Sequence, residues 1–205
     1  MIQTLIFDLG GVLVNYDLEA DVRALASVGL PDYFQWKHHP ELMAIAHPYL
    51  NGLMPESEFL TQLRPFCSPG VTDEQMLWSM MAVMADLPAS RLDTLLALRQ
   101  RYRILLLSNI NERTWRYCER QFLQAGHAPL ECFDRLFLSF EMGLAKPDPA
   151  IYERVLQESG AEASSTLFLD DTRANVEAAR AIGIDSWLVE MNHPEPLLER
   201  LLQRS

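Results

Sequence analysis

The chain has 205 residues, 49% of them hydrophobic and 22% charged, so it is long enough to bury a sizeable core as one domain or one domain with an insertion. Its formal net charge of −11 argues against nucleic acid or an anionic membrane surface as a partner, because both require a basic face. The three cysteines lack metal-ligand spacing, and neither a signal-peptide pattern nor a long apolar segment occurs, so we expect a cytoplasmic protein with reduced thiols.

An apolar run, TLIFDLGGVLV over residues 4–14, begins the predicted fold. A short apolar run without alternation is typical of a strand covered on both faces of a parallel sheet. Asp8 then follows a buried strand, and ligands of open α/β sheets bind beyond the carboxyl ends of the strands. Gly10 and Gly11 allow a tight turn and the close approach of a ligand to the backbone. On this stretch alone, an ordinary strand and turn is the alternative.

The next segment, residues 15–85, contains no second apolar strand and has helical patterning. Apolar residues at helical spacing predict a helix over 18–28, which the sequence GLP then stops. Thr72 with Gln75 three residues later is typical of a capped helix start, and we expect that helix to run over 73–84. The segment is therefore predicted to be a helical insertion after the first strand.

From Pro88 onward, helices and strands alternate. We expect strands over 104–107, 136–139, 166–169 and 186–189. The helices between and after them are expected over 91–101, from Asn111 to about 124, from Asp148 to about 159, and over 173–181 and 195–202. Such alternation implies a parallel sheet joined by right-handed crossovers, so the predicted fold class is α/β with a Rossmann-like core.

Polar residues follow three of the predicted strands directly. Asp8 follows the first, Ser108 and Asn109 follow the second, and Asp170 and Asp171 follow the strand over 166–169. Because a parallel sheet brings these strand ends together, the carboxylates would repel one another unless protons or a hard cation intervened. Oxygen ligands favour Mg²⁺ acting together with a substrate phosphate. Alternatively the Asp pair only caps the following helix, although one Asp would suffice for that.

Lys146, in the sequence GLAKPDP, supplies a positive charge for this group of anions. A single lysine is usually a solvated surface residue, but Pro147 and Pro149 stiffen the backbone around this one just before a helix. A rigidly placed ammonium group can keep a carboxylate ionised and bind phosphate oxygens. Ser108 and Asn109 are candidate hydrogen-bond donors to the same anion.

With these four motifs in order, the whole chain resembles the haloacid dehalogenase-like (HAD) superfamily of hydrolases. The motifs are FDLGGVL with Asp8, SN with Ser108, KPDP with Lys146, and FLDD with Asp170 and Asp171. The stretch from LSN to FLDDTRAN, with Asn175, is similar to the phosphatase domain of soluble epoxide hydrolases and to bacterial sugar-1-phosphate phosphatases. The resemblance implies a helical cap, residues 15–85, above a core of residues 1–14 and 86–205.

The resemblance also implies a role for each matching residue. Asp8 would be the nucleophile that forms an aspartyl phosphate, and it would bind Mg²⁺ together with the Gly10 carbonyl and Asp171. Asp170 would support this metal site. The groups that would hold the phosphoryl group are Ser108, Asn109 and Lys146. Such chemistry depends on positioning and charge neutralisation, and a carboxylate nucleophile divides hydrolysis into two easier displacements.

Gly10 departs from the pattern of most phosphatases in this superfamily, which have there a second Asp that serves as general acid and base. General acid and base help is worth about a hundredfold to ten-thousandfold in rate, so its absence either costs activity severely or is met by another group. Asp17 and the histidines of the insertion, His38, His39 and His47, are candidates. Without such a group, the rate would depend steeply on the acidity of the leaving alcohol.

Three functions therefore remain open from the sequence. The favoured one is a magnesium-dependent phosphatase of a small phosphorylated metabolite, such as a sugar phosphate, acting as a monomer or homodimer. A metal-independent 2-haloacid dehalogenase is an alternative, although the arginine that such enzymes use early in the cap is missing between Arg23 and Arg64. The third is a degenerate HAD module that binds a phosphorylated ligand or a partner protein. Gly10 favours this third function, whereas the intact Asp8, Lys146 and Asp171 oppose it.

Overall fold

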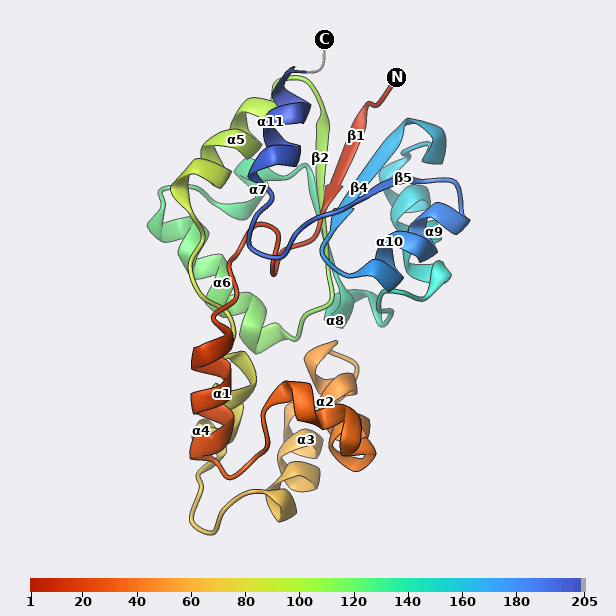
Figure 1. The fold of residues 1–205 in the computed structure, drawn as a ribbon. Coiled ribbons are helices and arrows are strands. Elements are labelled where there is room, and N and C mark those ends of the chain that lie inside the picture. The colour runs from red at the N-terminus through yellow and green to blue at the C-terminus, as the bar shows by residue number, and fades with distance from the viewer. Residues whose placement is uncertain (204–205) are drawn as a thin grey trace.

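The structure is a computed structural model that describes residues 1–203, including all side chains in this range except those of Tyr33, Phe34 and Lys37. Within residues 1–203, five parallel strands form one sheet in the order β3-β2-β1-β4-β5 (Figure 1). The strands are β1 (Thr4–Phe7), β2 (Arg103–Ser108), β3 (Arg135–Leu138), β4 (Thr166–Asp170) and β5 (Asp185–Leu188). The expected α/β fold with a Rossmann-like parallel sheet is confirmed.

Strand β1 occupies the centre of the sheet, where it is covered on both faces. Leu5 and Phe7 point into one hydrophobic cluster and Ile6 into another, and all three are fully buried. This is why the strand reads as an unbroken apolar run instead of an alternating one. The register pairs Phe7 with Leu106 of β2 and with Leu169 of β4, so the next residue, Asp8, leaves the sheet between the ends of two neighbouring strands.

Helices cover the two faces of the sheet. On the side of Leu5 and Phe7, the cluster includes residues of α5 (Ala89–Arg99), α6 (Glu112–Gln124) and α11 (Glu195–Gln203). On the side of Ile6, it includes residues of α9 (Pro149–Ser159) and α10 (Arg173–Ala181). Three short helical segments, α7 (Pro129–Cys132), α8 (Ser139–Met142) and η3 (Ala163–Ser165), were not predicted from the sequence.

Several element boundaries differ from those expected. Helix α5 begins and ends two residues earlier than predicted, β3 and β5 are each shifted by one residue, and Ser139 begins α8 instead of ending β3. Shifts of this size are common because helix and strand ends fray. The larger difference is in α4 (Asp73–Met81), which ends three residues before the expected position because Met84 forms an antiparallel bridge with Tyr16. The predicted capping box at Thr72 and Gln75 is present.

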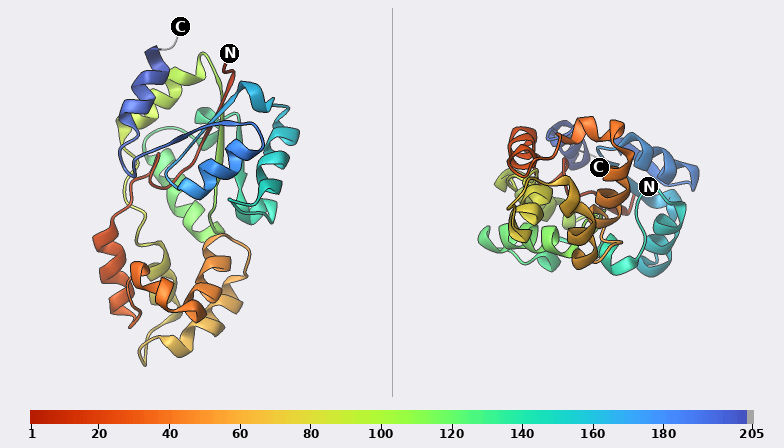
Figure 2. Two further views of the ribbon diagram at one scale, coloured as in Figure 1. Left: turned by 45° about the vertical axis from the view of Figure 1, so that its right-hand side comes forward. Right: turned by 90° about the horizontal axis from the view of Figure 1, so that it is seen from below.

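The helical insertion after β1 has a hydrophobic core of its own. Its elements are α1 (Leu18–Ser27), η1 (Tyr33–His38), α2 (Pro40–Leu50), α3 (Glu56–Leu63), η2 (Arg64–Phe66) and α4. Trp36, Phe59 and Leu63 belong to a buried cluster separate from those beside the sheet, and the rings of Tyr49 and Phe59 stack at 3.8 Å. Helices α1 to α4 are grouped at one end of the molecule in Figure 1 and in the left view of Figure 2, beyond the carboxyl ends of the strands.

The two segments that connect the insertion to the sheet domain run side by side. Asp17 N donates to Val83 O, Ala85 N to Asn15 O, and Asn15 N to Asp86 O, each at 2.8 Å. The insertion is therefore connected to the sheet domain by two adjacent chain segments next to Tyr16, which are joined by hydrogen bonds. No helix within residues 1–203 is long and apolar enough to cross a membrane.

Candidate active site

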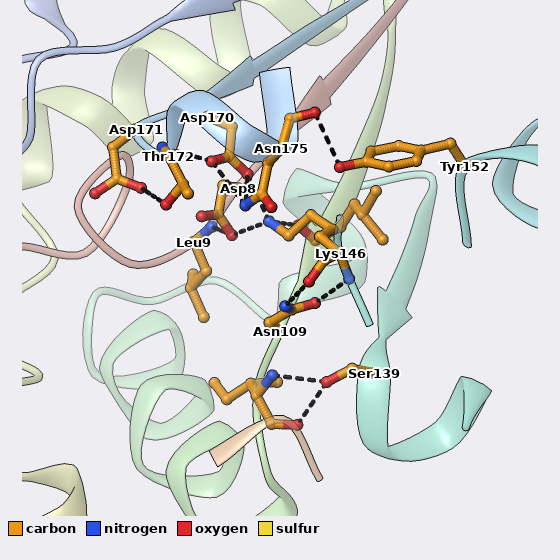
Figure 3. A network of polar contacts seen from close by, with 12 residues as sticks. Asp8, Leu9, Asn109, Ser139, Lys146, Tyr152, Asp170, Asp171, Thr172 and Asn175 are labelled. Atoms are coloured by element: carbon orange, nitrogen blue, oxygen red, sulfur yellow. Dashed lines mark hydrogen bonds and ion pairs between the residues drawn. The ribbon is translucent and has the colours of Figure 1, made fainter. Parts of the chain in front are cut away.

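Three carboxylates meet at the carboxyl edge of the sheet. Asp8 follows β1, Asp170 is the last residue of β4 and Asp171 follows it, and one oxygen from each lies within 4.8 Å of the others (Figure 3). The apolar strands bring them here because parallel neighbours end at the same edge. Asp8 and Asp170 are buried and Asp171 is half-buried, so the group has little water to screen its negative charge.

Lys146 lies between two of these carboxylates. Its Nζ is 2.8 Å from Asp8 Oδ1 and 2.7 Å from Asp170 Oδ2, and it donates to Leu107 O at 2.9 Å. The side chain is buried, and burial by itself lowers the pKa of Lys146. The charges of Asp170 and Asp8 outweigh this and raise its pKa above the ordinary value. Lys146 is therefore a fixed ammonium ion and not a solvated surface group.

The position of Lys146 is set by Asn109, the residue after β2. Asn109 Nδ2 donates to Lys146 O and Lys146 N donates to Asn109 Oδ1, both at 2.8 Å. The next residue along, Ile110, donates from its N to Ser139 Oγ and accepts from the same hydroxyl, which holds the loop after β2 against α8 (Figure 3). Ser108 ends β2 and is buried at the same sheet edge.

Asp170 and Asp171 differ sharply in their hydrogen bonds. Asp170 is fully buried and accepts from Lys146 Nζ, from Thr172 N at 2.7 Å, and from Asn175 Nδ2 at 3.0 and 3.1 Å. Asp171 accepts a side-chain hydrogen bond from the Thr172 hydroxyl at 3.3 Å. The Asp170 carboxylate is thus saturated by the protein, whereas that of Asp171 retains room for another partner.

Burial and mutual repulsion raise the pKa values of Asp8 and Asp171. The pKa of Asp8 rises to about 7, mainly through burial and against the lowering effect of Lys146. The pKa of Asp171 rises to about 6, again mainly through burial and next through the charge of Asp170. A site with one ammonium ion and three carboxylates lacks positive charge, and a divalent cation is the partner that oxygen ligands of this kind favour.

A side chain is excluded at Gly10 and at Gly11 for two different structural reasons. Gly11 has φ 72°, in the left-handed region that favours glycine, and a Cβ there would lie 2.3 Å from Asp171 Oδ2. At Gly10, a Cβ would lie 2.2 Å from Tyr16 Oη. Tyr16 was not among the site residues predicted from the sequence, because nothing in the local pattern indicates that its side chain turns back onto Gly10. Burial, then the charges of Asp8 and Asp171, raises the pKa of Tyr16.

The residues named from the sequence as possible replacements for an acid at position 10 either contact other protein groups or are exposed on the insertion. Asp17 Oδ1 accepts from Ala20 N at 2.8 Å and caps α1. His38 and His47 are exposed on the insertion, and the half-buried His39 has Nδ1 3.5 Å from Glu41 Oε1.

A cleft of about 920 Å³ lies between the insertion and α6. Its lining includes Glu56, Trp78, Arg113 and Phe140, but not the three carboxylates. Arg113 of α6 forms two hydrogen bonds with Glu56, at 2.8 and 3.1 Å, and a weaker ion pair with Glu74 at 3.3 Å. This bidentate pairing ties the insertion to the sheet domain across the cleft.

The insertion also packs directly on the loop after β2. A Cβ on Gly52, between α2 and α3, would lie 2.3 Å from Phe140 Cβ and 2.8 Å from Ile110 O. Gly52 thus lies against the loop after β2 that carries Asn109 and Ile110.

The comparisons with known proteins agree with this geometry. The family model described as haloacid dehalogenase-like hydrolase matches residues 2–183. A D-ribitol-5-phosphate phosphatase of Bacteroides thetaiotaomicron is 30% identical over 192 residues, covering 93% of each chain. Phosphatase MT3486 of Mycobacterium tuberculosis is 29% identical over 92% of this chain and 88% of its own.

Solved structures show the same relationship. A HAD family enzyme of Bacteroides thetaiotaomicron, in complex with magnesium and inorganic phosphate, has a TM-score of 0.83 at 30% identity, covering 94% of this chain and 96% of that one. An L-2-haloacid dehalogenase, PA0810, has a TM-score of 0.65 at 20% identity and covers 93% of this chain and 86% of its own, a likeness of fold alone. Together with these matches, the parallel sheet and the carboxylates at its edge define a hydrolase with an α/β fold. The chain belongs to the haloacid dehalogenase-like hydrolases.

Proposed function

We propose that the protein is a magnesium-dependent phosphatase of a small phosphorylated metabolite that works through an aspartyl phosphate on Asp8. The chain is a hydrolase of phosphate monoesters. The observation that carries the mechanism is the environment of Asp8: its Oδ1 accepts from Leu9 N at 2.7 Å and pairs with Lys146. These contacts hold the carboxylate at the strand end in one orientation, as a nucleophile requires.

Magnesium would be held by Asp8, Asp171 and the Gly10 carbonyl, with Asp170 as a positioning residue. The different hydrogen bonds of the two neighbouring aspartates support this division, because Asp170 already accepts from three protein groups. When bound, the ion neutralises phosphate charge and acts as a Lewis acid. The three-carboxylate group fits a hard cation that prefers oxygen ligands.

The phosphoryl group would be held by Lys146, Ser108 and Asn109. Lys146 is the fixed cation of the site, and Ser108 lies at the end of the strand next to Asp8. The Asn109 side chain already bonds to the backbone of Lys146 through both its oxygen and its nitrogen, so its main contribution is to position that lysine. In this arrangement Lys146 stabilises charge on both the nucleophile and the transferred group.

Residues 15–85 would act as the cap that selects the substrate, and residues 1–14 and 86–205 as the catalytic core, of which Arg204 and Ser205 lie outside the described residues. The separate hydrophobic core of the insertion and the contact of Gly52 with Phe140 support this division. A cap that closes over the carboxylates excludes water and adds substrate contacts.

We assign the substrate to the sugar and polyol phosphates. The relative named D-ribitol-5-phosphate phosphatase covers nearly the whole chain, and this supports the assignment. A panel of sugar 1-phosphates, terminal sugar phosphates and polyol phosphates, each with Mg²⁺ or with EDTA, would test it. We expect phosphate release that requires Mg²⁺ and falls at least about a thousandfold in Asp8→Asn.

Asp93→Asn, an exposed change on α5, is the matched control and should retain full activity. Phosphate release that survives both EDTA and Asp8→Asn would contradict the mechanism. Chloride release from a 2-haloacid without metal would support the dehalogenase alternative instead. Binding of phosphorylated compounds without turnover would support a degenerate module.

A further inference from the structure

The hydroxyl of Tyr16 occupies the space that a side chain at position 10 would fill. A Cβ built on Gly10 would lie 2.2 Å from Tyr16 Oη, 2.5 Å from Cζ and 2.7 Å from Cε1. Gly10 is not among the glycines with a positive φ, so the backbone itself would accept an L residue. Space taken by Tyr16, and not backbone conformation, therefore excludes a side chain at position 10.

The Tyr16 ring stands beside the carboxylates. A Cβ on Gly11 would lie 3.3 Å from Tyr16 Cε2 and 2.3 Å from Asp171 Oδ2, so the ring and Asp171 pack against the same turn. The hydroxyl lies over Gly10, two residues after the nucleophile. Within residues 1–203, the recorded hydrogen bonds of Tyr16 with side chains are those of its backbone N and O with Asn192, and none involves its hydroxyl. A phenol held beside the reacting carboxylate thus retains its donor for a ligand.

Asn192 fixes Tyr16 relative to this turn. Asn192 Oδ1 accepts from Tyr16 N at 2.8 Å, its Nδ2 donates to Tyr16 O at 2.9 Å, and its N donates to Gly11 O at 2.7 Å. The buried Arg91 donates to Asn192 O at 2.5 Å and to Leu13 O at 3.2 Å. The backbone of Tyr16 and the glycine turn are therefore clamped by one shared network, which is the condition for a preorganised donor.

We propose that Tyr16 Oη donates a hydrogen bond to the ester oxygen of the substrate while the bond from phosphorus to that oxygen breaks. The inference rests on the proposed role of Asp8. As Asp8 forms its bond to phosphorus, the electron pair of the broken bond moves to the ester oxygen, where Tyr16 stabilises the developing charge. Tyr16 stays neutral, and the released alkoxide takes its proton from water.

A tyrosine that only fills space at the base of the insertion would have a different signature. Tyr16→Phe keeps the ring and removes the hydroxyl, so a packing role leaves the dependence on the leaving group unchanged. A donor to the ester oxygen matters most when the leaving alcohol is a weak acid. Loss of one such donor typically costs about a hundredfold to a thousandfold in rate.

The test compares glycerol 3-phosphate, an ester of a weakly acidic alcohol, with 4-nitrophenyl phosphate, which has an acidic leaving group. In Tyr16→Phe we expect kcat/KM to fall about a hundredfold for the first and less than about threefold for the second. Tyr102→Phe, far from the carboxylates and partly buried against the core, is the matched control and should leave both rates unchanged. Equal losses for the two esters in Tyr16→Phe, or no loss for either, would overturn the proposal.

A second pair of variants tests whether a side chain at position 10 and the side chain of Tyr16 compete for the same space. Gly10→Asp alone should be poorly active, because its side chain meets the Tyr16 ring. Adding Gly10→Asp to Tyr16→Ala should raise glycerol 3-phosphate turnover at least about tenfold above Tyr16→Ala alone. If the double variant turned over glycerol 3-phosphate no faster than Tyr16→Ala, the proposal that the two side chains compete for one space would be contradicted. Wild-type enzyme that hydrolyses neither ester with Mg²⁺ would instead contradict the proposed function.

Discussion

Asn109 and Lys146 are joined by two hydrogen bonds between the Asn109 side chain and the Lys146 backbone, each 2.8 Å long. Lys146 in turn contacts Asp8 and Asp170 through its ammonium group. The residue after β2 therefore helps to fix where the single cation among the described site residues stands relative to Asp8, the proposed nucleophile. These two hydrogen bonds join two motifs that are distant in the sequence, SN at residues 108–109 and KPDP at residues 146–149.

Asn109→Ala should lower kcat about tenfold to a hundredfold, because a small displacement of a catalytic cation reduces the rate strongly. Steady-state kinetics together with the melting temperature would measure this effect. Asn109→Asp is the informative partner variant, since it keeps the acceptor for Lys146 N and loses the donor to Lys146 O. Unchanged kcat in a folded Asn109→Ala protein would show that Lys146 keeps its place without Asn109.

Asp171→Ala should weaken Mg²⁺ binding at least about tenfold more than Asp170→Ala, because Asp171 is the aspartate of the pair with room for another partner. Asp170→Ala should instead lower stability by about 3 to 5 kcal/mol, since it leaves the buried Lys146 with one fewer anion. Titration calorimetry and urea unfolding would separate the two effects. Equal Mg²⁺ affinities in the two variants would show that the division of roles is wrong.

The metal-free protein should lose stability as pH rises from about 4 to about 7. The pKa values of Asp8 and Asp171 are raised from 3.8 to about 7 and about 6, so over this window the folded protein binds more protons than the unfolded chain. The stabilisation from protonated Asp8 and Asp171 is complete below pH 3.8 and is lost as pH passes the folded values. Its size is on the order of a few kcal/mol.

Urea unfolding in EDTA across this window would measure the loss, and Asp171→Asn should flatten the curve. Mg²⁺ should raise the melting temperature more at about pH 8 than at about pH 5, because it binds ionised carboxylates. If the stability of the metal-free protein instead rose steadily from about pH 4 to about pH 7, the raised pKa values of Asp8 and Asp171 would be contradicted.

Arg113→Gln should loosen the contact between the insertion and α6 and raise KM more than it lowers kcat. Arg113 makes a bidentate pair with Glu56, which lowers the pKa of Glu56 below its ordinary value. Both side chains are partly exposed, so the pair is worth no more than about 1 kcal/mol, or about fivefold in KM. Arg116→Gln is the matched control, because the ion pairs that Arg116 makes among the described residues, with Glu112 and Glu119, stay within α6.

High salt should reduce the difference between Arg113→Gln and the wild type, since the ion pair is screened. A double variant with Glu56→Gln should cost no more than either single change. If Arg116→Gln raised KM as much as Arg113→Gln, the effect would belong to the general charge of α6 and not to the pairing across the cleft.

The sequence by itself determined the sheet and the positions of its reactive ends. Unbroken apolar runs before Asp8 and Asp170 mark strands buried on both faces, and parallel strands necessarily bring those two carboxylates to one edge. The motifs built on these ends, with Lys146 between them in the chain, were enough to identify the family. Helices α2 and α3 were not predicted individually: α2 contains Pro48, which interrupts a helical pattern, and α3 is only 8 residues long.

Only the tertiary structure decided which side chains surround the carboxylates and how each carboxylate is hydrogen-bonded. Asn192 reaches Tyr16 across 176 residues, and Tyr16 then fills the space over Gly10. Asp170 and Asp171 are chemically identical neighbours in the sequence, yet folding saturates one with hydrogen bonds and leaves room beside the other. Such differences depend on where turns and side chains from separate segments meet, and local periodicity carries no information about those meetings.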